Sequence, residues 1–182
     1  SLANDVGVSS VTIREWISVL ETSYIVTLVQ PYHKNYNKRI NKSPKVYFID
    51  TGLLCFLLNI HNKEVLSTHP LMGAIFENFI VTETLKFKWN RGDFSPIYFW
   101  RENNGKEIDL LIETDQKTLA VEIKAGKTFS LSYFKNLKDW LSISSTQPEQ
   151  AAVVYNGEHS MITKNGSLLQ WHEFENLLSA NT

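Results

Sequence analysis

The chain is poor in the residues that mark disulfide-rich or membrane-embedded proteins. It has one cysteine, Cys55, which excludes an internal disulfide framework and fits a reducing, cytoplasmic compartment. Its longest apolar runs fall far short of the roughly 18 residues that a membrane span needs, so we expect no membrane partner. The formal net charge of −1 gives no overall attraction for a polyanion.

What is present indicates a folded protein. Hydrophobic residues make up 43% of the 182 positions and aromatic residues 12%, which is enough for one real core plus a small appendage. The chain opens on Ser1-Leu2-Ala3-Asn4, without methionine and inside a predicted helix-turn-helix. We therefore expect it to be a piece of a longer protein.

Residues 1–52 are predicted to form a partial winged helix-turn-helix. A glycine-containing turn precedes a helix whose apolar stripe, Ile13, Trp16, Ile17 and Leu20, is expected to be buried. Two strands follow, at 24–29 and 46–49. The segment between them is basic and has no acid. Its side chains Lys34, Lys38, Arg39 and Lys42, with Arg14 on the helix, are the predicted nucleic-acid contacts. The alternatives are a solvated loop or a surface that docks on another domain.

Residues 53–182 follow the pattern of an α/β domain with a central mixed sheet. A helix is predicted from Pro70 to about Lys88, with strands next at 97–101, 107–112 and 119–124. A helix at 130–141 then leads to a buried strand at 151–155, and a last helix covers 172–178. The order is α-β-β-β-α-β, in which three strands run as a meander and a helical crossover leads to the fourth.

The hairpin of the second and third strands carries the chemistry. With a turn centred between positions 115 and 116, Asp109 falls directly opposite Glu122, with the two Cβ atoms about 5 Å apart. Two carboxylates so placed repel each other unless a cation lies between them, and a divalent metal ion is the natural candidate. The two-residue period of a strand puts Lys124 on the face of Glu122. The open alternative is a structural cluster of ion pairs.

Glu77, Asp109, Glu122 and Lys124 resemble the nuclease signature PD-(D/E)XK. The resemblance implies a restriction-endonuclease-like fold in which Asp109, Glu122 and Glu77 hold Mg²⁺ or Mn²⁺ and Lys124 orients the attacking water. A surface glutamate is the alternative for Glu77. Two departures stand out: Ile108 replaces the proline of the signature, and position 129 is Phe where related nucleases have Gln before a tyrosine. Gly126-Lys127-Thr128 is no P-loop, because position 121 is Val.

A wider resemblance is to the family called domain of unknown function 4143, which forms the C-terminal half of many bacterial and archaeal AAA+ ATPases. It rests on Pro31-Tyr32, Lys45–Leu54, Gly73–Asn78, Tyr98–Arg101, Glu107–Asp109 and Val121–Gly126. The resemblance implies a DNA-associated region and a metal-dependent DNA endonuclease. It also implies that ATP binds only in an N-terminal domain outside this sequence. DNA, that ATPase domain and a second copy of the chain are the expected partners. The alternatives are a non-catalytic binding module with a vestigial nuclease site and an oligomerisation or regulatory domain.

Overall fold

The computed structural model describes residues 2–32, 43–102, 105–114 and 117–181. Within them the chain forms one eight-stranded mixed sheet in the order β2-β1-β3-β4-β5-β6-β8-β7. The α/β class with a central mixed sheet is therefore confirmed. The strands are β1 Val26–Pro31, β2 Lys45–Phe48, β3 Ile97–Arg101, β4 Glu107–Glu113, β5 Thr118–Lys124, β6 Ala151–Tyr155, β7 Met161–Thr163 and β8 Gly166–Gln170.

The helices accompany the sheet in the predicted order, α5-β3-β4-β5-α6-β6. Side-chain N-caps stabilise the first turn of several helices. Ser9 caps α2, Asp50 caps α3 and Asn62 caps α4 by accepting hydrogen bonds from backbone N–H groups. In the described ranges, none of the helices is long and apolar enough to cross a membrane. They are α1 Leu2–Val6, α2 Ser10–Thr22, α3 Thr51–Leu57, α4 Lys63–Thr68, α5 Met72–Trp89, α6 Lys135–Ile143 and α7 Phe174–Ser179, with 3-10 turns at Leu131–Phe134, Pro148–Gln150 and Trp171–Glu173.

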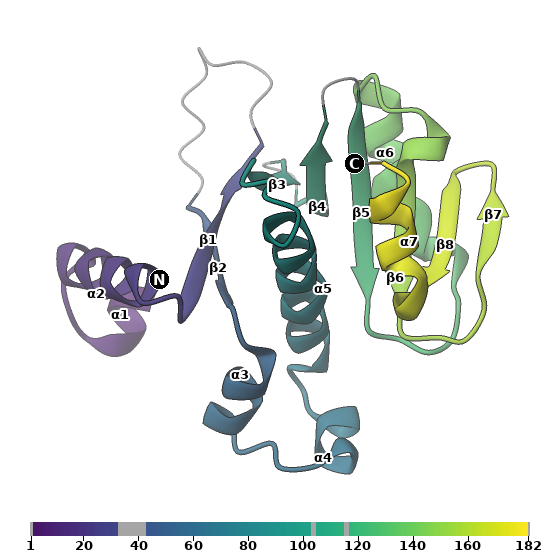
Figure 1. The fold of residues 1–182 in the computed structure, drawn as a ribbon. Coiled ribbons are helices and arrows are strands. Elements are labelled where there is room, and N and C mark those ends of the chain that lie inside the picture. Colours follow the sequence, from purple (N-terminus) through teal and green to yellow (C-terminus); the bar gives the residue numbers. More distant parts are fainter. Residues whose placement is uncertain (1, 33–42, 103–104, 115–116, 182) are drawn as a thin grey trace.

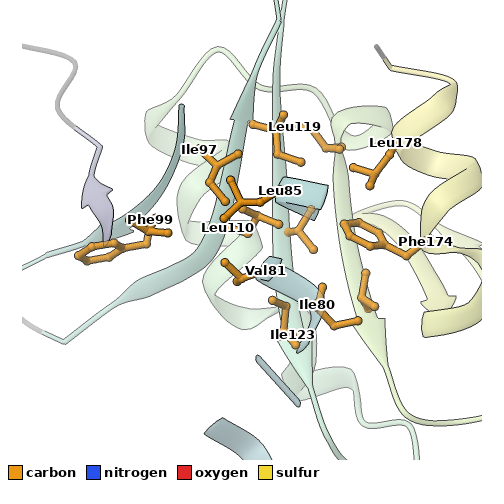
Figure 2. Packing of buried hydrophobic residues seen from close by; sticks show 14 of the residues in the cluster. Ile80, Val81, Leu85, Ile97, Phe99, Leu110, Leu119, Ile123, Phe174 and Leu178 are labelled. Carbon is orange, nitrogen blue, oxygen red and sulfur yellow. The ribbon is translucent and has the colours of Figure 1, made fainter. Parts of the chain in front are cut away.

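The central strands have both faces covered. β3, β4 and β5 pair antiparallel, and α6 returns the chain so that β6 lies parallel to β5 (Figure 1). α5 and α7 pack on one face, and α6 packs on the other. Figure 2 shows the first of these layers, where Val81 and Leu85 of α5 meet Leu110 and Leu119 of the sheet. Burial on both sides explains the nearly continuous apolar runs of β4, β5 and β6.

The N-terminal elements extend the same sheet. β1 and β2 form an antiparallel hairpin, and β1 also pairs parallel with β3 through Gln30–Tyr98 and Pro31–Phe99. The predicted domain boundary at residue 52 therefore falls within a chain whose hydrogen-bonded sheet is continuous across it. The winged-helix assignment and the boundary both stay predictions.

The predicted burial of the α2 stripe is wrong in part. Ile13 is buried, but Trp16 is 50% exposed and Leu20 is 37% exposed. The reason is that, among the described residues, α2 packs mainly on the short α1 and on β1, which offer too little surface to cover two large side chains. Arg14 is exposed, as a nucleic-acid contact requires. Lys34, Lys38, Arg39 and Lys42 lie outside the described residues.

Other differences are local. α5 begins at Met72, so Pro70 lies before the helix rather than in its first turn. The predicted helix at 130–141 is a 3-10 turn followed by α6, which begins at Lys135. The hairpin of β7 and β8 was not predicted. Its strands are only three and five residues long, which is too short for an alternating pattern to stand out.

Gly166 opens β8 in a conformation that other residues resist. Its φ is +126°, and an added Cβ would lie 2.3 Å from the carbonyl oxygen of Ala151. We expect Gly166→Ala to lower the free energy of unfolding by about 2 kcal/mol or more, because both the backbone and its neighbour must move. Gly73→Ala on α5, where a Cβ meets nothing within 4 Å, is the matched control and should be neutral or stabilising. Urea unfolding of both variants measures the difference, and equal midpoints would contradict the argument.

Candidate functional site

A cleft of about 720 Å³ lies where β2, the start of α5 and the ends of β4 and β5 meet. All four predicted catalytic side chains, Glu77, Asp109, Glu122 and Lys124, line it. A smaller cavity of about 260 Å³ between α5 and α7 is lined by both aromatic and charged side chains and includes none of these four. The cleft is therefore the candidate site.

A β-bulge sets the position of Asp109. Between the pairs Tyr98–Leu111 and Trp100–Ile108, β4 has two residues, Asp109 and Leu110, where β3 has only Phe99. Bulges re-aim side chains and often lie beside functional sites. Here Ile108 packs in the α6 layer and Leu110 in the α5 layer, so the strict alternation of faces is broken at Asp109.

The predicted register of the hairpin is confirmed where the strands pair. The regular pairs run from Glu113–Thr118 to Leu110–Val121, as a turn centred between 115 and 116 requires. One step further, Asp109 Oδ2 accepts a hydrogen bond of 2.8 Å from the backbone N–H of Ile123. The bulge and this bond hold the Asp109 carboxylate beside the residue that follows Glu122.

Glu122 and Lys124 share one face of β5, as predicted. Val121 and Ile123 pack in the opposite, α5 layer. The Glu122 side chain is only 1% exposed, and its Oε1 accepts a 3.2 Å hydrogen bond from Asn136 of α6. Lys124 Nζ lies 2.5 Å from Glu122 Oε2 and 3.8 Å from Asp109 Oδ2. One ammonium group thus lies within ion-pair distance of two nearly buried carboxylates.

The electrostatics follow from this crowding. Burial, and then repulsion by Glu122, raises the pKa of Asp109 to about 8, while Lys124 acts in the opposite sense. Burial also raises the pKa of Glu122, against the effect of Lys124. For Lys124, burial alone would lower the pKa, but attraction to Asp109 and Glu122 outweighs it and raises the pKa. Despite Lys124, both carboxyl groups therefore hold a proton more readily than an exposed carboxyl group does.

Glu77 lies in the same cleft but already has partners. Its Oε1 accepts hydrogen bonds from Lys45 Nζ at 2.8 Å and from Tyr47 Oη at 2.6 Å. Lys45 also forms an ion pair with Glu107, which in turn binds Arg101. Burial, and then the charge of Glu77, raises the pKa of Tyr47 well above its usual range, so its phenol stays protonated and donates.

Sequence reasoning missed the roles of Lys45, Tyr47, Glu107 and Asn136. Lys45 and Tyr47 alternate along β2 with Val46 between them, which marks one face of a strand. That pattern was visible, but what the face meets depends on how β2 and α5 pack, about 30 residues further along. Asn136 gave no signal, because a polar residue on an amphipathic helix is usually solvated.

The donor set fits a hard cation in part. Two carboxylates and backbone carbonyls are the oxygen ligands that Mg²⁺ and Mn²⁺ take. In the part of the chain that the structure describes, no group of three or more His, Cys, Asp or Glu side chains is arranged to hold a metal ion. A metal at Asp109 and Glu122 would displace Lys124 and draw its other ligands from the backbone, water or substrate.

The fold and the cleft define an α/β protein with a largely buried acid-and-lysine site at the ends of two central strands of a mixed sheet. Residues 72–174 match the family described as "Domain of unknown function (DUF4143)", and the chain belongs to that family. Residues 1–64 match a second family, "Domain of unknown function (DUF8612)". The second match contains Lys45 and Tyr47, so the contacts to Glu77 join the two matched segments.

Two curated relatives are similar over most of this chain. They are "Uncharacterized protein Mb2031c" of Mycobacterium bovis and "Uncharacterized protein Rv2008c" of Mycobacterium tuberculosis, each 32% identical over 158 residues. The match covers 87% of this chain and 34% of each relative, so the chain spans about a third of their length. No solved structure matches.

Proposed function

We propose that the chain is a metal-dependent nuclease unit that hydrolyses phosphodiester bonds of DNA at the Asp109–Glu122 pair. The observation that carries the proposal is the pair itself. Two carboxylates, 13% and 1% exposed, share one lysine in a cleft. Burying these charges destabilises the folded state, so a role in stability alone does not explain the arrangement. Strongly perturbed carboxylates in a cleft are typical of functional sites. The order α5-β3-β4-β5-α6-β6 also supports the proposal, because it is the order that the resemblance to these nucleases implies.

Each side chain has a role that its position allows. Asp109 and Glu122 would hold Mg²⁺ or Mn²⁺, together with the backbone carbonyl of Ile123. A bound ion of this kind lowers the pKa of a coordinated water and neutralises charge on the phosphate. Once Lys124 is released from the carboxylates, its ammonium would hold the attacking water or stabilise the charge that develops on phosphorus oxygens.

Glu77 would act from α5, which also lines the cleft. Lys45 and Tyr47 fix its Oε1, so its carboxylate is oriented before any ligand enters. From there it would hold a second metal ion or a water bound to the first. Asn136 donates to Glu122 and keeps that carboxylate turned into the site.

A second candidate is a non-catalytic module that binds DNA or protein and keeps a vestigial nuclease site. The observation that favours it is that the carboxylates already have cationic partners: Lys124 pairs with Glu122 and Asp109, and Lys45 pairs with Glu77. In this reading the acids and lysines are structural ion pairs.

The proposed partners are DNA and an AAA+ ATPase domain of the same polypeptide. Support for DNA comes from exposed Arg14 and from the basic composition of residues 33–42. Support for the ATPase domain is the resemblance described above and the greater length of the mycobacterial relatives. In this proposal ATP binds only to that other domain.

Cleavage of labelled single-stranded, duplex and branched DNA in Mg²⁺ or Mn²⁺ tests the nuclease proposal. We expect the wild type to cut and Glu122→Gln, which keeps the size of the side chain, to lose at least about 100-fold in rate because one charged metal ligand is gone. Glu83→Gln, at an exposed glutamate of α5, is the matched control and should cut like the wild type.

The same proteins separate the two candidates. Mn²⁺ binding to the native state should raise the melting temperature of the wild type by mass action and leave that of Glu122→Gln nearly unchanged. No cleavage together with no metal response in either protein would overturn the nuclease and leave the binding module.

A further inference from the structure

The cleft has a second wall that the proposed chemistry does not use. This apolar wall consists of the lining residues Phe48 of β2, Leu54 and Leu58 of α3 and its C-cap, and Leu71 just before α5. Leu71 is 47% exposed, so this wall meets solvent in the described structure. A reaction at a phosphate group requires no apolar wall of this kind, so the wall points to another part of the substrate.

The size of the cleft limits what that part is. A volume of about 720 Å³ is within the roughly 300–1,000 Å³ of pockets that enclose small organic ligands. A nucleotide is a ligand of that size, whereas a duplex is far wider. The carboxylates are also recessed: Glu122 is 1% exposed and Asp109 is 13% exposed. The phosphate must come to them inside the cleft.

The charges of the lining argue in the same direction. Among the described lining residues, the cations are Lys45, Arg101 and Lys124, and each is in an ion pair with a carboxylate. The carboxylates are Glu77, Glu107, Asp109 and Glu122, so the described lining has no excess of positive charge. Duplex binding draws its affinity from many lysine and arginine contacts to phosphates, which this lining does not supply.

We propose that the cleft takes an unpaired nucleotide, with the face of its base against Leu54, Leu58 and Leu71 and its phosphate toward Asp109 and Glu122. Bases in a duplex are stacked and paired, so their faces cannot reach such a wall. Bases of a single strand or an unpaired segment can splay out and pack on apolar side chains. The inference rests on the proposed function in taking the bound polymer to be nucleic acid.

The inference is tested with oligonucleotides of one sequence in three forms. These forms are a single strand, a blunt duplex and a duplex with an unpaired bubble. Fluorescence anisotropy without added metal measures binding, and gel analysis in Mn²⁺ measures cleavage. We expect the single strand and the bubble to bind at least about ten-fold tighter than the blunt duplex, which corresponds to the contribution of one packed base. Cuts in the bubble substrate should fall in or beside its unpaired segment.

Two variants tie the preference to the apolar wall. Leu71→Glu adds a charge to a half-exposed lining position and should weaken single-strand binding about ten-fold. Leu57→Glu, at a 56% exposed position of α3 that does not line the cleft, should leave binding within about two-fold. Melting temperatures verify that both variants fold. If Leu71→Glu does not fold, Leu58→Glu tests a second lining position.

The outcomes separate this inference from the proposed function. A blunt duplex bound and cut as well as the single strand would overturn the inference and keep the nuclease. No cleavage of any substrate, with the preference for unpaired strands intact and dependent on Leu71, would overturn the nuclease and keep the inference. Absence of binding by every oligonucleotide would overturn the inference as well.

Discussion

Asp109→Asn is expected to stabilise the protein at alkaline pH while abolishing cleavage. Asn keeps the shape of the side chain and an oxygen that can accept the Ile123 N–H, but it removes a carboxylate whose pKa is raised to about 8. Loss of the metal ligand that we propose Asp109 to be should slow cleavage by about 1,000-fold, or about 4 kcal/mol of transition-state stabilisation. The gain in stability and the loss of activity would then come from the same negative charge.

The effect on stability has a defined dependence on pH. In the unfolded chain Asp109 titrates near 3.8, whereas in the folded chain it titrates near 8. Between these values the folded state holds a proton that the unfolded state has lost, so the wild type loses stability as the pH rises through this window. The advantage of Asp109→Asn should therefore be near zero at pH 4 and reach several kcal/mol at pH 9.

Urea unfolding at several pH values measures this difference. Asp139→Asn, at a surface carboxylate that pairs with Lys106, is the control and should show no such trend. A constant or negative difference for Asp109→Asn would mean that the charge of Asp109 is compensated in the folded protein. Saturating Mn²⁺ should reverse the order of stability, because in the proposed function the ion binds only the folded wild type.

Lys45→Met is expected to be the most destabilising of the substitutions at the cleft. Lys45 is the shared partner of Glu77 and Glu107, whose side chains are 25% and 17% exposed. Burial lowers the pKa of Lys45, but the two glutamates outweigh it and keep the ammonium charged. Methionine would leave two partly buried carboxylates without this cation, at a cost of about 3 kcal/mol in unfolding free energy.

A conservative and a distant substitution make this result interpretable. Lys45→Arg keeps the charge and should recover most of the stability. Lys63→Met, at an exposed lysine of α4, should change it by less than about 0.5 kcal/mol. Equal unfolding midpoints for Lys45→Met and the wild type would show that Glu77 and Glu107 are compensated by other groups.

The central hairpin could be predicted because its signals are local. Glu122 and Lys124 alternate with Val121 and Ile123, and a two-residue period fixes their face once the segment is a strand. The register followed from the position of one short turn. These steps depend on residues within about 15 positions of one another, where chain geometry leaves few choices.

What could not be predicted depends on contacts between distant segments. The bulge at Asp109 is the result of how β4 registers against β3, and no residue type in β4 demands it. The approach of Lys45 and Tyr47 to Glu77 requires that β2, β1 and β3 join one sheet beside α5. Trp16 was predicted to be buried because of its helical spacing. The helix is there, but the surface that packs against it is too small to cover this side chain.

The parallel pairing of β1 with β3 has a consequence for how the polypeptide is divided. The family match begins at residue 72, yet a fragment starting there would lose β1 and β2 and leave β3 as a bare sheet edge. Such an edge invites association with other chains. It would also lose the lysine and tyrosine that hold Glu77. The segment matched by the family is thus smaller than the hydrogen-bonded sheet to which it belongs.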